Sequence, residues 1–456
     1  MSLIEANPST NSSSRPASGA ASGRAALELA LARGELREVE ILWNDHQGHP
    51  RGKRITADGF LERAQGPGFA FCDAVLCWDV TGDVKDGLRW SSWDTGFPDL
   101  YAIPDLDSYR PVPWRRGVGQ VICDLYGHDR QLARTAPRSV LRRVLDRLAA
   151  LGYEAEVGVE IEFHLLKHDG SPLSQGVHAY SLQKALELEP ALDTIVSGLT
   201  GYVDLEGTET EYGPGQVEVN LQHTRALAAA GQAARLKYGV RELARRAGAI
   251  ATFMAKPFGD QAGNSMHLHV SLWRDGKPVF APDGHSENGL HKLAIAGMFE
   301  HLPGIVLYGA PTVNSYKRFT PLSFAPSTRT WGHDNRTVAI RSLIETPAAT
   351  RIELRTGAAD AEPHWVIAAA LAAIVAGLEG DPADPGEPGQ GNLYGSGEPL
   401  PSNLAEGIAA ARADTVIAEI LGEDAVHDYT KLAQYEWETF LSAVTEWDRD
   451  RYLTSI

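Results

Sequence analysis

The sequence predicts an α+β fold with two parts, a smaller β-rich part over residues 25–134 and a larger mixed part over residues 135–456. Short strands broken by Pro-rich turns, such as PDLYAIPDLDSYRPVPW, fill the first part. The pattern changes at TAPRSVLRRVLDRLAALGY, where apolar residues recur every three to four positions, as on one face of a helix. Beyond it, short strands alternate with helices, which indicates a separate mixed domain.

The elements of the N-terminal part follow from local composition. Residues 1–24 are rich in Ser, Asn, Pro, Ala and Gly and are predicted to form a disordered tail. Residues 25–36 have the apolar spacing of a helix, and REVEILWNDHQGHPRGKRI then predicts a β-hairpin. Thr135 is expected to cap the first helix of the larger part, with Pro137 in its first turn.

The larger part contains three further conspicuous helical patterns. GQAARLKYGVRELARRAGAIATFM predicts a long amphipathic helix that leads into a strand, and HKLAIAGMFEHLPGIVLYG predicts another helix. WVIAAALAAIVAGL is apolar on all sides, so we expect a helix buried in the core. EGDPADPGEPGQGNLYGSGEPLPSN predicts an exposed excursion before a helical C-terminal part.

Composition excludes several classes of function. The chain has 59 acidic and 42 basic residues and a net charge of −17, which argues against a general nucleic-acid binder. Its three cysteines lack CxxC spacing and fit a reduced cytoplasm. No secretory leader is visible, and the most apolar run is shorter than the roughly 20 residues of a membrane span. We therefore expect a cytoplasmic protein without nucleic-acid or membrane partners.

Four short segments carry chemically versatile side chains, and three of them place these at every second position, on one face of a strand. The segments are VGVEIEFHLL with Glu160 and Glu162, EYGPGQVEVNL with Glu211 and Glu218, SMHLHVSLW with His267 and His269, and TRIELRTG with Arg351, Glu353 and Arg355. Any one segment is an ordinary strand with a solvated face. Together they use paired acids and imidazoles where such a face more often has Lys, Thr and Ser.

The residue types on these strands indicate metal-assisted phosphoryl transfer. Carboxylates with an imidazole suit Mg²⁺ or Mn²⁺, and clustered arginines suit phosphate or carboxylate groups. Neither GxxxxGK[ST] nor a GxGxxG that opens a helix occurs, which argues against a P-loop or Rossmann nucleotide site. From these residues alone, the best interpretation is a generic Mg²⁺-dependent kinase.

The ordered motifs EIE, EYGPGQVE, SMHLHVSL, NSYKRF, NRTVAIR and RIELR resemble glutamine synthetase over most of the chain, from about residue 25 onward. The resemblance implies two or three Mg²⁺ or Mn²⁺ ions, with a first set of ligands in Glu162, Glu211 and Glu218 and a second in Glu160, His267 and Glu353. It implies ATP contacts by Glu206, His269, Ser271, Arg341 and Arg351. It places Arg336 on the transferring phosphoryl group and assigns L-glutamate binding to Gly263, Arg318 and Arg355.

The same resemblance implies a fold, an assembly and a reaction. The fold is a small β-grasp-like N-terminal domain followed by a large catalytic domain with a curved antiparallel sheet. The assembly is a homododecamer of two stacked hexamers, in which the N-terminal domain of one subunit completes the active site of the next. In the reaction, the glutamate γ-carboxylate attacks ATP to give γ-glutamyl phosphate and ADP, and an amine then displaces phosphate.

The stretch NSYKRFTPLSFAP departs from the ammonia-using members of the family. Those members read Pro-Gly-Tyr-Glu-Ala-Pro after the two basic residues, and their flap glutamate attracts ammonium and takes its proton. Phe324 stands at that position here and can do none of this proton chemistry, although it can exclude water. Ala262 also replaces a family asparagine that helps to hold glutamate.

The prediction is therefore a γ-glutamyl–amine ligase that uses an organic amine, with Phe324 setting amine specificity. A small monoamine such as ethanolamine is favoured over a polyamine, because a long polycation would want acids near the flap. One alternative is a true glutamine synthetase that takes an acid from another loop. A second is a non-catalytic member with a structural or sensing role, which the retained ligands and arginines argue against.

Overall fold

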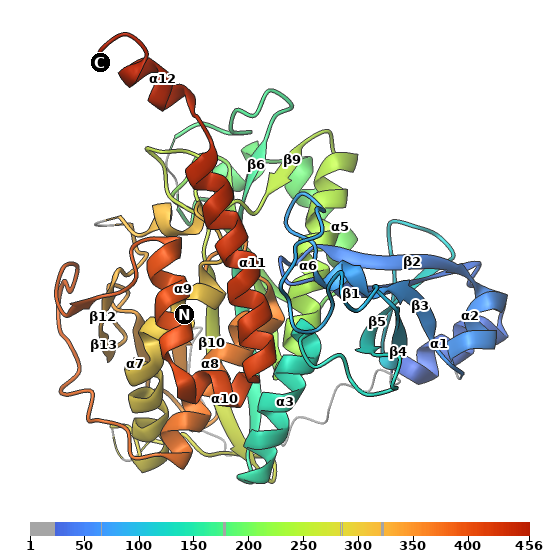
Figure 1. The fold of residues 1–456 in the computed structure, drawn as a ribbon, viewed down its shortest axis with the longest axis horizontal. Coiled ribbons are helices and arrows are strands. Elements are labelled where there is room, and N and C mark those ends of the chain that lie inside the picture. Colours follow the sequence, from blue (N-terminus) through green and yellow to red (C-terminus); the bar gives the residue numbers. More distant parts are fainter. Residues whose placement is uncertain (1–22, 65, 177–178, 283, 285, 321–322) are drawn as a thin grey trace, which may run out of the picture.

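A computed structural model describes residues 23–64, 66–176, 179–282, 284, 286–320 and 323–456 (Figure 1). The predicted tail lies outside these residues except for its last two, which are already helical in α1 (Gly23–Ala32). The first helix therefore begins and ends earlier than the expected 25–36.

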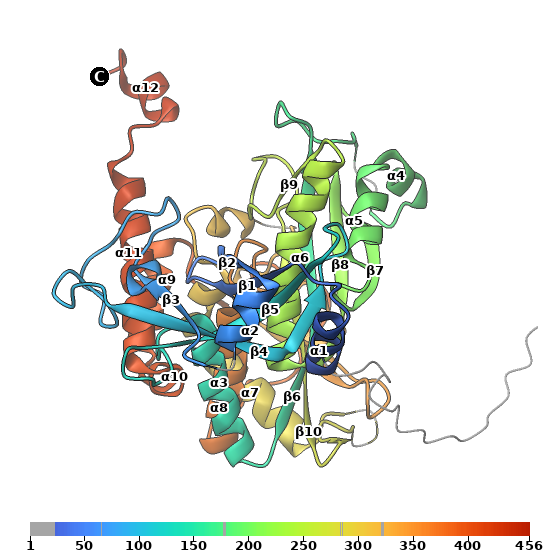
Figure 2. The same ribbon diagram turned by 90° about the vertical axis from the view of Figure 1, so that its right-hand side faces the viewer.

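A five-stranded sheet forms the N-terminal part, in the order β2-β1-β5-β4-β3. Strand β1 runs parallel to β5, and the other neighbours are antiparallel. The predicted hairpin is present as β1 and β2. The elements are β1 (Glu38–Asn44), β2 (Pro50–Thr56), α2 (Ala57–Ala64), β3 (Phe69–Cys72), the 3-10 helix η1 (Asp73–Leu76), β4 (Asp99–Pro111) and β5 (Val118–Tyr126). Figure 1 shows this sheet at the side of the larger part, and Figure 2 turns it toward the viewer.

The larger part is built on a nine-stranded sheet, which confirms the predicted fold class. Its order is β13-β14-β15-β10-β6-β8-β7, with β11 against β10 and β9 against β6, and only the β13–β14 pair is parallel. The strands are β6 (Glu154–Leu166), β7 (Leu205–Thr210), β8 (Gln216–Arg225), β9 (Ile250–Thr252), β10 (Met266–Arg274), β11 (Lys277–Pro278), β13 (Trp331–His333), β14 (Ile340–Leu343) and β15 (Arg351–Leu354). A separate pair joins β12 (Thr328–Arg329) to β16 (Glu398–Pro399).

Helices supply most of the remaining core. Helix α8 is buried over all of its residues from Pro363 to Gly377, as its all-round apolar sequence predicts. The helices are α3 (Pro137–Ala150), α4 (Leu182–Glu187), α5 (Ala191–Leu199), α6 (Ala226–Arg246), α7 (Gly289–Gly309), the 3-10 helix η2 (Ser315–Arg318), α8 (Pro363–Glu379), α9 (Leu404–Ala413), α10 (Thr415–Leu421), α11 (Glu423–Ser442) and α12 (Glu446–Tyr452). In the described part of the chain, no helix is both long enough and apolar enough to cross a bilayer.

The start of α3 differs from the sequence expectation. Pro137 occupies the first turn as predicted, but the N-cap residue is Ala136, which offers no side-chain acceptor. Thr135 is buried just before it, and its hydroxyl has no hydrogen-bond partner among the described residues. The two sheets lie on either side of this point in the chain, and the division into domains at residues 134 and 135 stays a prediction.

Contacts between the two parts include hydrogen bonds from α3 and α6 to β4 and β5, and a further group at the start of α8 and on α11. The Asn44 amide donates to Glu362 Oε1 at 3.1 Å, and the indole N–H of Trp365 donates to His46 Nδ1 at 3.3 Å. Asp428 on α11 accepts from the backbone N–H groups of Arg89 and Trp90. These buried or half-buried bonds attach the N-terminal sheet to the helical side of the larger part.

Candidate active site

Strand register brings the predicted polar residues onto one patch of the large sheet. Four neighbouring strand pairs contribute, and each pair sets predicted residues directly opposite one another: Glu162 with Glu218, His267 with Glu160, His269 with Glu353, and Arg341 with Glu353. Side chains opposite each other on neighbouring strands have Cβ atoms about 4.5–5.5 Å apart. The alternation in the sequence therefore becomes one continuous polar surface.

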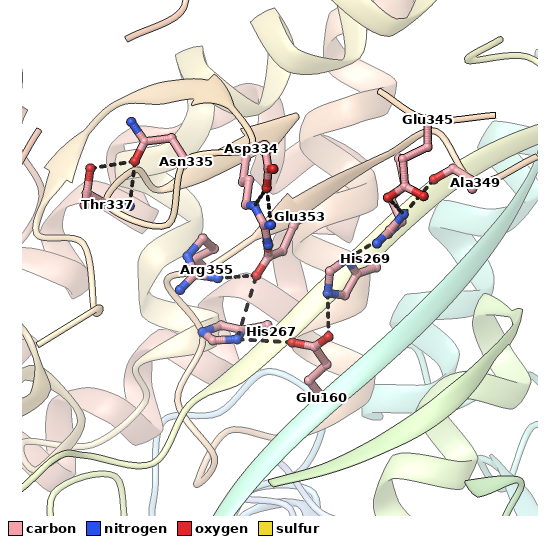
Figure 3. Close-up of polar contacts among 12 residues, drawn as sticks. Glu160, His267, His269, Asp334, Asn335, Thr337, Glu345, Ala349, Glu353 and Arg355 are labelled. Carbon is pink, nitrogen blue, oxygen red and sulfur yellow. Dashed lines mark hydrogen bonds and ion pairs between the residues drawn. The ribbon is translucent and has the colours of Figure 1, made fainter. Parts of the chain in front are cut away.

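Glu160 contacts both imidazoles of β10 (Figure 3). Its Oε1 lies 3.0 Å from His269 Nε2, and its Oε2 lies 3.5 Å from His267 Nδ1. Burial alone would raise the pKa of Glu160, but its contacts with the two imidazoles hold that pKa well below its ordinary value. Glu160 is thus an ionised carboxylate between two potential metal-ligating rings.

Further acids crowd the neighbouring strands β7 and β8. Burial, followed by the charge of Glu162, raises the pKa of Glu211 to about 8. Burial together with Glu160 and Glu162 raises the pKa of Glu218 well above its ordinary value. Carboxylates packed this closely need a cation beside them to stay ionised together. His267 Nε2 is also buried without a hydrogen-bond partner, so the donor set fits divalent metal ions.

Three groups of side chains bring ligand atoms within 4.8 Å of one another. They are Glu160, His269 and Glu353; Glu160, Glu218 and His267; and Glu209, Glu211 and Glu218. Among the described residues, no one group contains all of the second predicted ligand set, since Glu160 shares one group with Glu353 and another with His267. Glu162 belongs to none of these groups, and its Oε2 accepts from the Ser265 N–H at 2.7 Å and the Gln216 amide at 2.9 Å.

Glu209 is a candidate ligand that the sequence reading missed. It lies opposite Glu218 in the β7–β8 pair. The sequence could have identified it, because Glu209 and Glu211 in TETEYG have the same two-residue spacing as the polar residues of the other segments. Glu209 forms one of the three groups with Glu211 and Glu218, and the predicted ligand role of Glu162 stays a prediction.

Glu353 is the most deeply buried acid of the site, with 0% of its surface exposed. Arg341 Nη1 donates to its Oε2 at 2.8 Å, and the Arg355 guanidinium donates to its Oε1. Burial would raise the pKa of Glu353, but the charge of Arg355 and the two nearby imidazoles bring that pKa down to about 2. This arrangement keeps a buried carboxylate charged and fixed in direction.

The residues predicted to contact ATP lie on the same sheet, four of them on β10, β14 and β15 and the fifth, Glu206, on β7 at the opposite edge. Arg351 Nε donates to His269 Nδ1 at 3.1 Å, and the Ser271 hydroxyl accepts from the Trp273 indole at 3.0 Å. Arg341 points to Glu353 and Asp334, while Glu206 is exposed on β7. Their binding of ATP remains a prediction.

Arg336, predicted to face the transferring phosphoryl group, is an exposed residue in the turn between β13 and β14. It lines a surface cavity of about 380 Å³ together with Asp334, Asn335 and residues 388–391. Within the described residues it has no hydrogen bond or ion pair, unlike Arg341. A guanidinium without partners at a cavity wall can still bind an anionic group.

The predicted glutamate-binding residues form a tight, buried corner. Arg318 is 1% exposed, and its guanidinium donates to Ser265 Oγ at 3.0 Å and to the Thr356 carbonyl at 3.4 Å. Arg355 is also buried and is paired with Glu353. Neither guanidinium group is exposed in this conformation. The binding of the glutamate carboxylates by Arg318 and Arg355 therefore stays a prediction.

The buried corner that contains Arg318 has space only for a glycine at position 263. A Cβ atom at Gly263 would lie 2.5 Å from Arg318 Cγ and 2.6 Å from the Ala255 carbonyl oxygen. We expect Gly263→Ala to lower the free energy of unfolding by about 1–3 kcal/mol, because side chain and backbone must shift. Chemical denaturation measures this against Gly259→Ala, whose Cβ meets no atom within 4 Å. Equal stability of the two variants would contradict the steric argument.

Phe324 is the residue predicted to occupy the flap position, and residues 321–322 near it fall outside the described chain. It has a φ of 56°, a left-handed conformation that is rare for a bulky residue. Its ring is 39% exposed and lies 5.4 Å from the ring of Tyr212, centroid to centroid. Tyr212 directly follows Glu211, so the aromatic pair adjoins the acidic group on β7 and β8.

Comparison with known proteins agrees with this geometry. Residues 134–452 match the family model of the glutamine synthetase catalytic domain. A glutamate–isopropylamine ligase from a Pseudomonas species is 34% identical over 435 residues, covering 90% of this chain and 94% of the relative. Type-1 glutamine synthetase 2 of Dictyostelium discoideum is 34% identical over 439 residues, covering 92% and 84%.

Solved structures extend the similarity to the whole fold. A GmaS–ADP complex superposes with a TM-score of 0.83 at 31% identity, covering 94% of this chain and 99% of the other. Because the family model spans more than half of the chain and the relatives align over nearly all of it, the chain belongs to the glutamine synthetase family.

Proposed function

We propose that this protein joins the γ-carboxylate of L-glutamate to a small organic monoamine, with ATP as the energy source and γ-glutamyl phosphate as the intermediate. The chain is an ATP-dependent ligase of its family. The choice of amine rests on one observation: an aromatic side chain, Phe324, stands at the flap position and pairs with Tyr212 beside the acidic group. Overall identity does not discriminate, since an amine ligase and a glutamine synthetase are both 34% identical to the chain.

An aromatic pair favours an alkylamine over ammonium for two reasons. Burying carbon against the rings contributes about 0.8 kcal/mol per CH₂ group, which ammonium cannot gain. The faces of Tyr212 and Phe324 also attract an alkylammonium ion by about 0.5–2 kcal/mol. Phe324 keeps its left-handed backbone, at a typical cost of about 1–3 kcal/mol, which is consistent with a functional role for its position.

The acid and imidazole cluster would hold divalent metal ions in this reaction. The residues concerned are Glu160, Glu209, Glu211, Glu218, His267, His269 and Glu353. Bound Mg²⁺ or Mn²⁺ would supply positive charge that offsets the negative charge of the phosphate groups during transfer.

The arginines of the chain would orient the two anionic substrates. Arg351 and Arg341 lie along β14 and β15, where they can bind phosphate oxygens of ATP, and exposed Arg336 can reach the transferring group. Arg318 and Arg355 would position the glutamate carboxylates from the buried corner next to Gly263. Such positioning converts an encounter in solution into a reaction within one complex.

The assembly and location of the protein are part of the same proposal. We infer a dodecamer of two stacked hexamers in the cytoplasm, with the N-terminal part of residues 25–134 completing the site of a neighbouring subunit.

Release of ADP with L-glutamate, Mg²⁺-ATP and a panel of amines tests this proposal. We expect kcat/KM for isopropylamine or ethanolamine to exceed that for ammonium by about tenfold or more, since two buried methylenes are worth about 1.6 kcal/mol. Putrescine should be a poorer substrate, because the flap sequence TPLSFAP has no acid to pair with its second cation. Efficient turnover with ammonium alone would make the protein a glutamine synthetase, and no turnover with any amine would support a non-catalytic role.

A further inference from the structure

A second cavity of about 260 Å³ lies between the N-terminal part and the larger part, apart from the acid cluster of the sheet. Its walls come from the β1–β2 turn at residues 46–49, from Asp79 and Val80, and from α6, the β9 segment and α11. The volume is slightly below the roughly 300–1,000 Å³ typical of drug-sized ligands, so it suits a smaller molecule.

Three residues that line this cavity have hydrogen-bond donors with unused capacity: buried His46 and Lys237 and exposed Arg241. His46 is 3% exposed, and its Nδ1 accepts from the Trp365 indole, so its proton is on Nε2. That buried N–H has no partner in the described part of the chain. Lys237 Nζ donates to the Asp360 and Ala361 carbonyls at 3.3 and 2.8 Å; burial lowers the pKa of Lys237 to about 7, and its ammonium form has one further proton to donate. Arg241 stacks on Phe253 and otherwise makes no hydrogen bond or ion pair with described residues.

Acceptors without partners face the same cavity. Asp360 Oδ2 accepts from the Thr312 and Ser315 hydroxyls at 2.9 and 2.8 Å, while its buried Oδ1 has no described partner. Gln47 Oε1 is likewise buried and unpaired among described residues. Buried polar atoms in native proteins are nearly always satisfied, so unpaired donors and acceptors on one cavity point to a ligand that carries both.

The remaining walls are apolar and the charges are mixed. Val80, Phe253, Met254 and Leu432 supply hydrocarbon surface. Glu436 on α11 also lines the cavity, and Asp79 is already paired with Lys85 at 2.8 Å. A simple anion would be repelled by Glu436, and a simple cation would be repelled by the basic groups of Lys237 and Arg241. A molecule with one charge of each sign and an apolar body matches both.

We propose that this cavity binds a small zwitterionic amino acid with an apolar side chain. Its carboxylate takes hydrogen bonds from His46, Lys237 and Arg241, its ammonium group donates to Asp360 Oδ1, and its side chain packs on Phe253 and Met254. Because His46 belongs to the N-terminal part and Lys237 to the larger part, the ligand joins the two.

The cavity lies directly behind the buried corner of the active site. Asp360 holds Ser315, the first residue of η2, and η2 ends at Arg318. A ligand on Oδ1 of Asp360 therefore acts on the same carboxylate that fixes the start of η2. The binding itself does not depend on which amine the enzyme uses.

Titration calorimetry of the full chain with L-leucine tests the site without any turnover. We expect saturable binding of L-leucine and none of leucinol or 4-methylpentanoate, which lack the carboxylate and the ammonium group respectively. Saturating L-glutamate with Mg²⁺-ATP should not displace L-leucine. Displacement, or equal binding of either analogue, would overturn the proposal, as would absence of L-leucine binding.

Two variants locate the ligand. Arg241→Leu should weaken L-leucine binding by about tenfold or more, the loss of one charge-assisted hydrogen bond. Arg245→Leu is the matched control on the same helix, because Arg245 is exposed, pairs with Glu242 and does not line the cavity. Met254→Trp, at a half-exposed wall position, should block binding by filling the space. Unchanged binding in both Arg241→Leu and Met254→Trp would show that L-leucine binds elsewhere.

Discussion

Phe324→Glu is expected to reverse the amine preference of the enzyme. The new carboxylate would attract ammonium and accept its proton, and the aromatic pair with Tyr212 would be lost. We expect kcat/KM for isopropylamine to fall by about 10–100-fold, the worth of two or three buried methylenes, while kcat/KM for ammonium rises. Steady-state ADP release with each amine at saturating L-glutamate and ATP measures the change.

A Phe324→Leu variant is the matched control for this substitution. Leucine keeps an apolar surface at the flap without adding an acid, so its preference should remain on the side of the organic amine. If Phe324→Glu and Phe324→Leu have the same amine preference as the parent, Phe324 has no part in specificity. Unfolding curves of all variants separate effects on preference from effects on stability.

Glu353→Gln is expected to have the second large effect, on both stability and metal binding. The substitution removes the buried charge that Arg341 and Arg355 share; Arg341 keeps Asp334, while Arg355 loses its ion pair. Breaking a buried ion pair from one side typically costs about 3–5 kcal/mol. We expect a loss of this size in the free energy of unfolding measured in EDTA, where no metal contributes.

The same variant should lose activity by about a hundredfold or more, since a predicted metal ligand becomes neutral. Calorimetry with Mn²⁺ should show weaker binding. Glu398→Gln is the control, because Glu398 is an exposed acid paired with Arg329, and its loss should stay within about 0.5 kcal/mol. Parent-like unfolding in EDTA would contradict the buried-pair argument, and unchanged Mn²⁺ affinity would contradict the ligand role of Glu353.

Much of the fold was predictable because its elements have strong local periodicity. The all-round apolar run at α8, the hairpin of β1 and β2 and the long helix α6 are set by residues near in sequence. The predicted N-cap residue of α3 was wrong by one position, because Thr135 is buried and Ala136 is the N-cap residue. Side-chain capping competes with burial, and the sequence alone does not show which of them prevails.

The sequence by itself determined the family, the class of reaction and most of the polar face, because a two-residue period places Glu160, His267 and Glu353 on one side of their strands whatever surrounds them. The tertiary structure alone decided how those strands align, and therefore that Glu209 joins Glu218 while Glu162 turns to Ser265. It also decided that residues far apart in the chain, from His46 to Glu436, enclose one cavity. Strand register and contacts between domains depend on packing over the whole molecule, which no local pattern records.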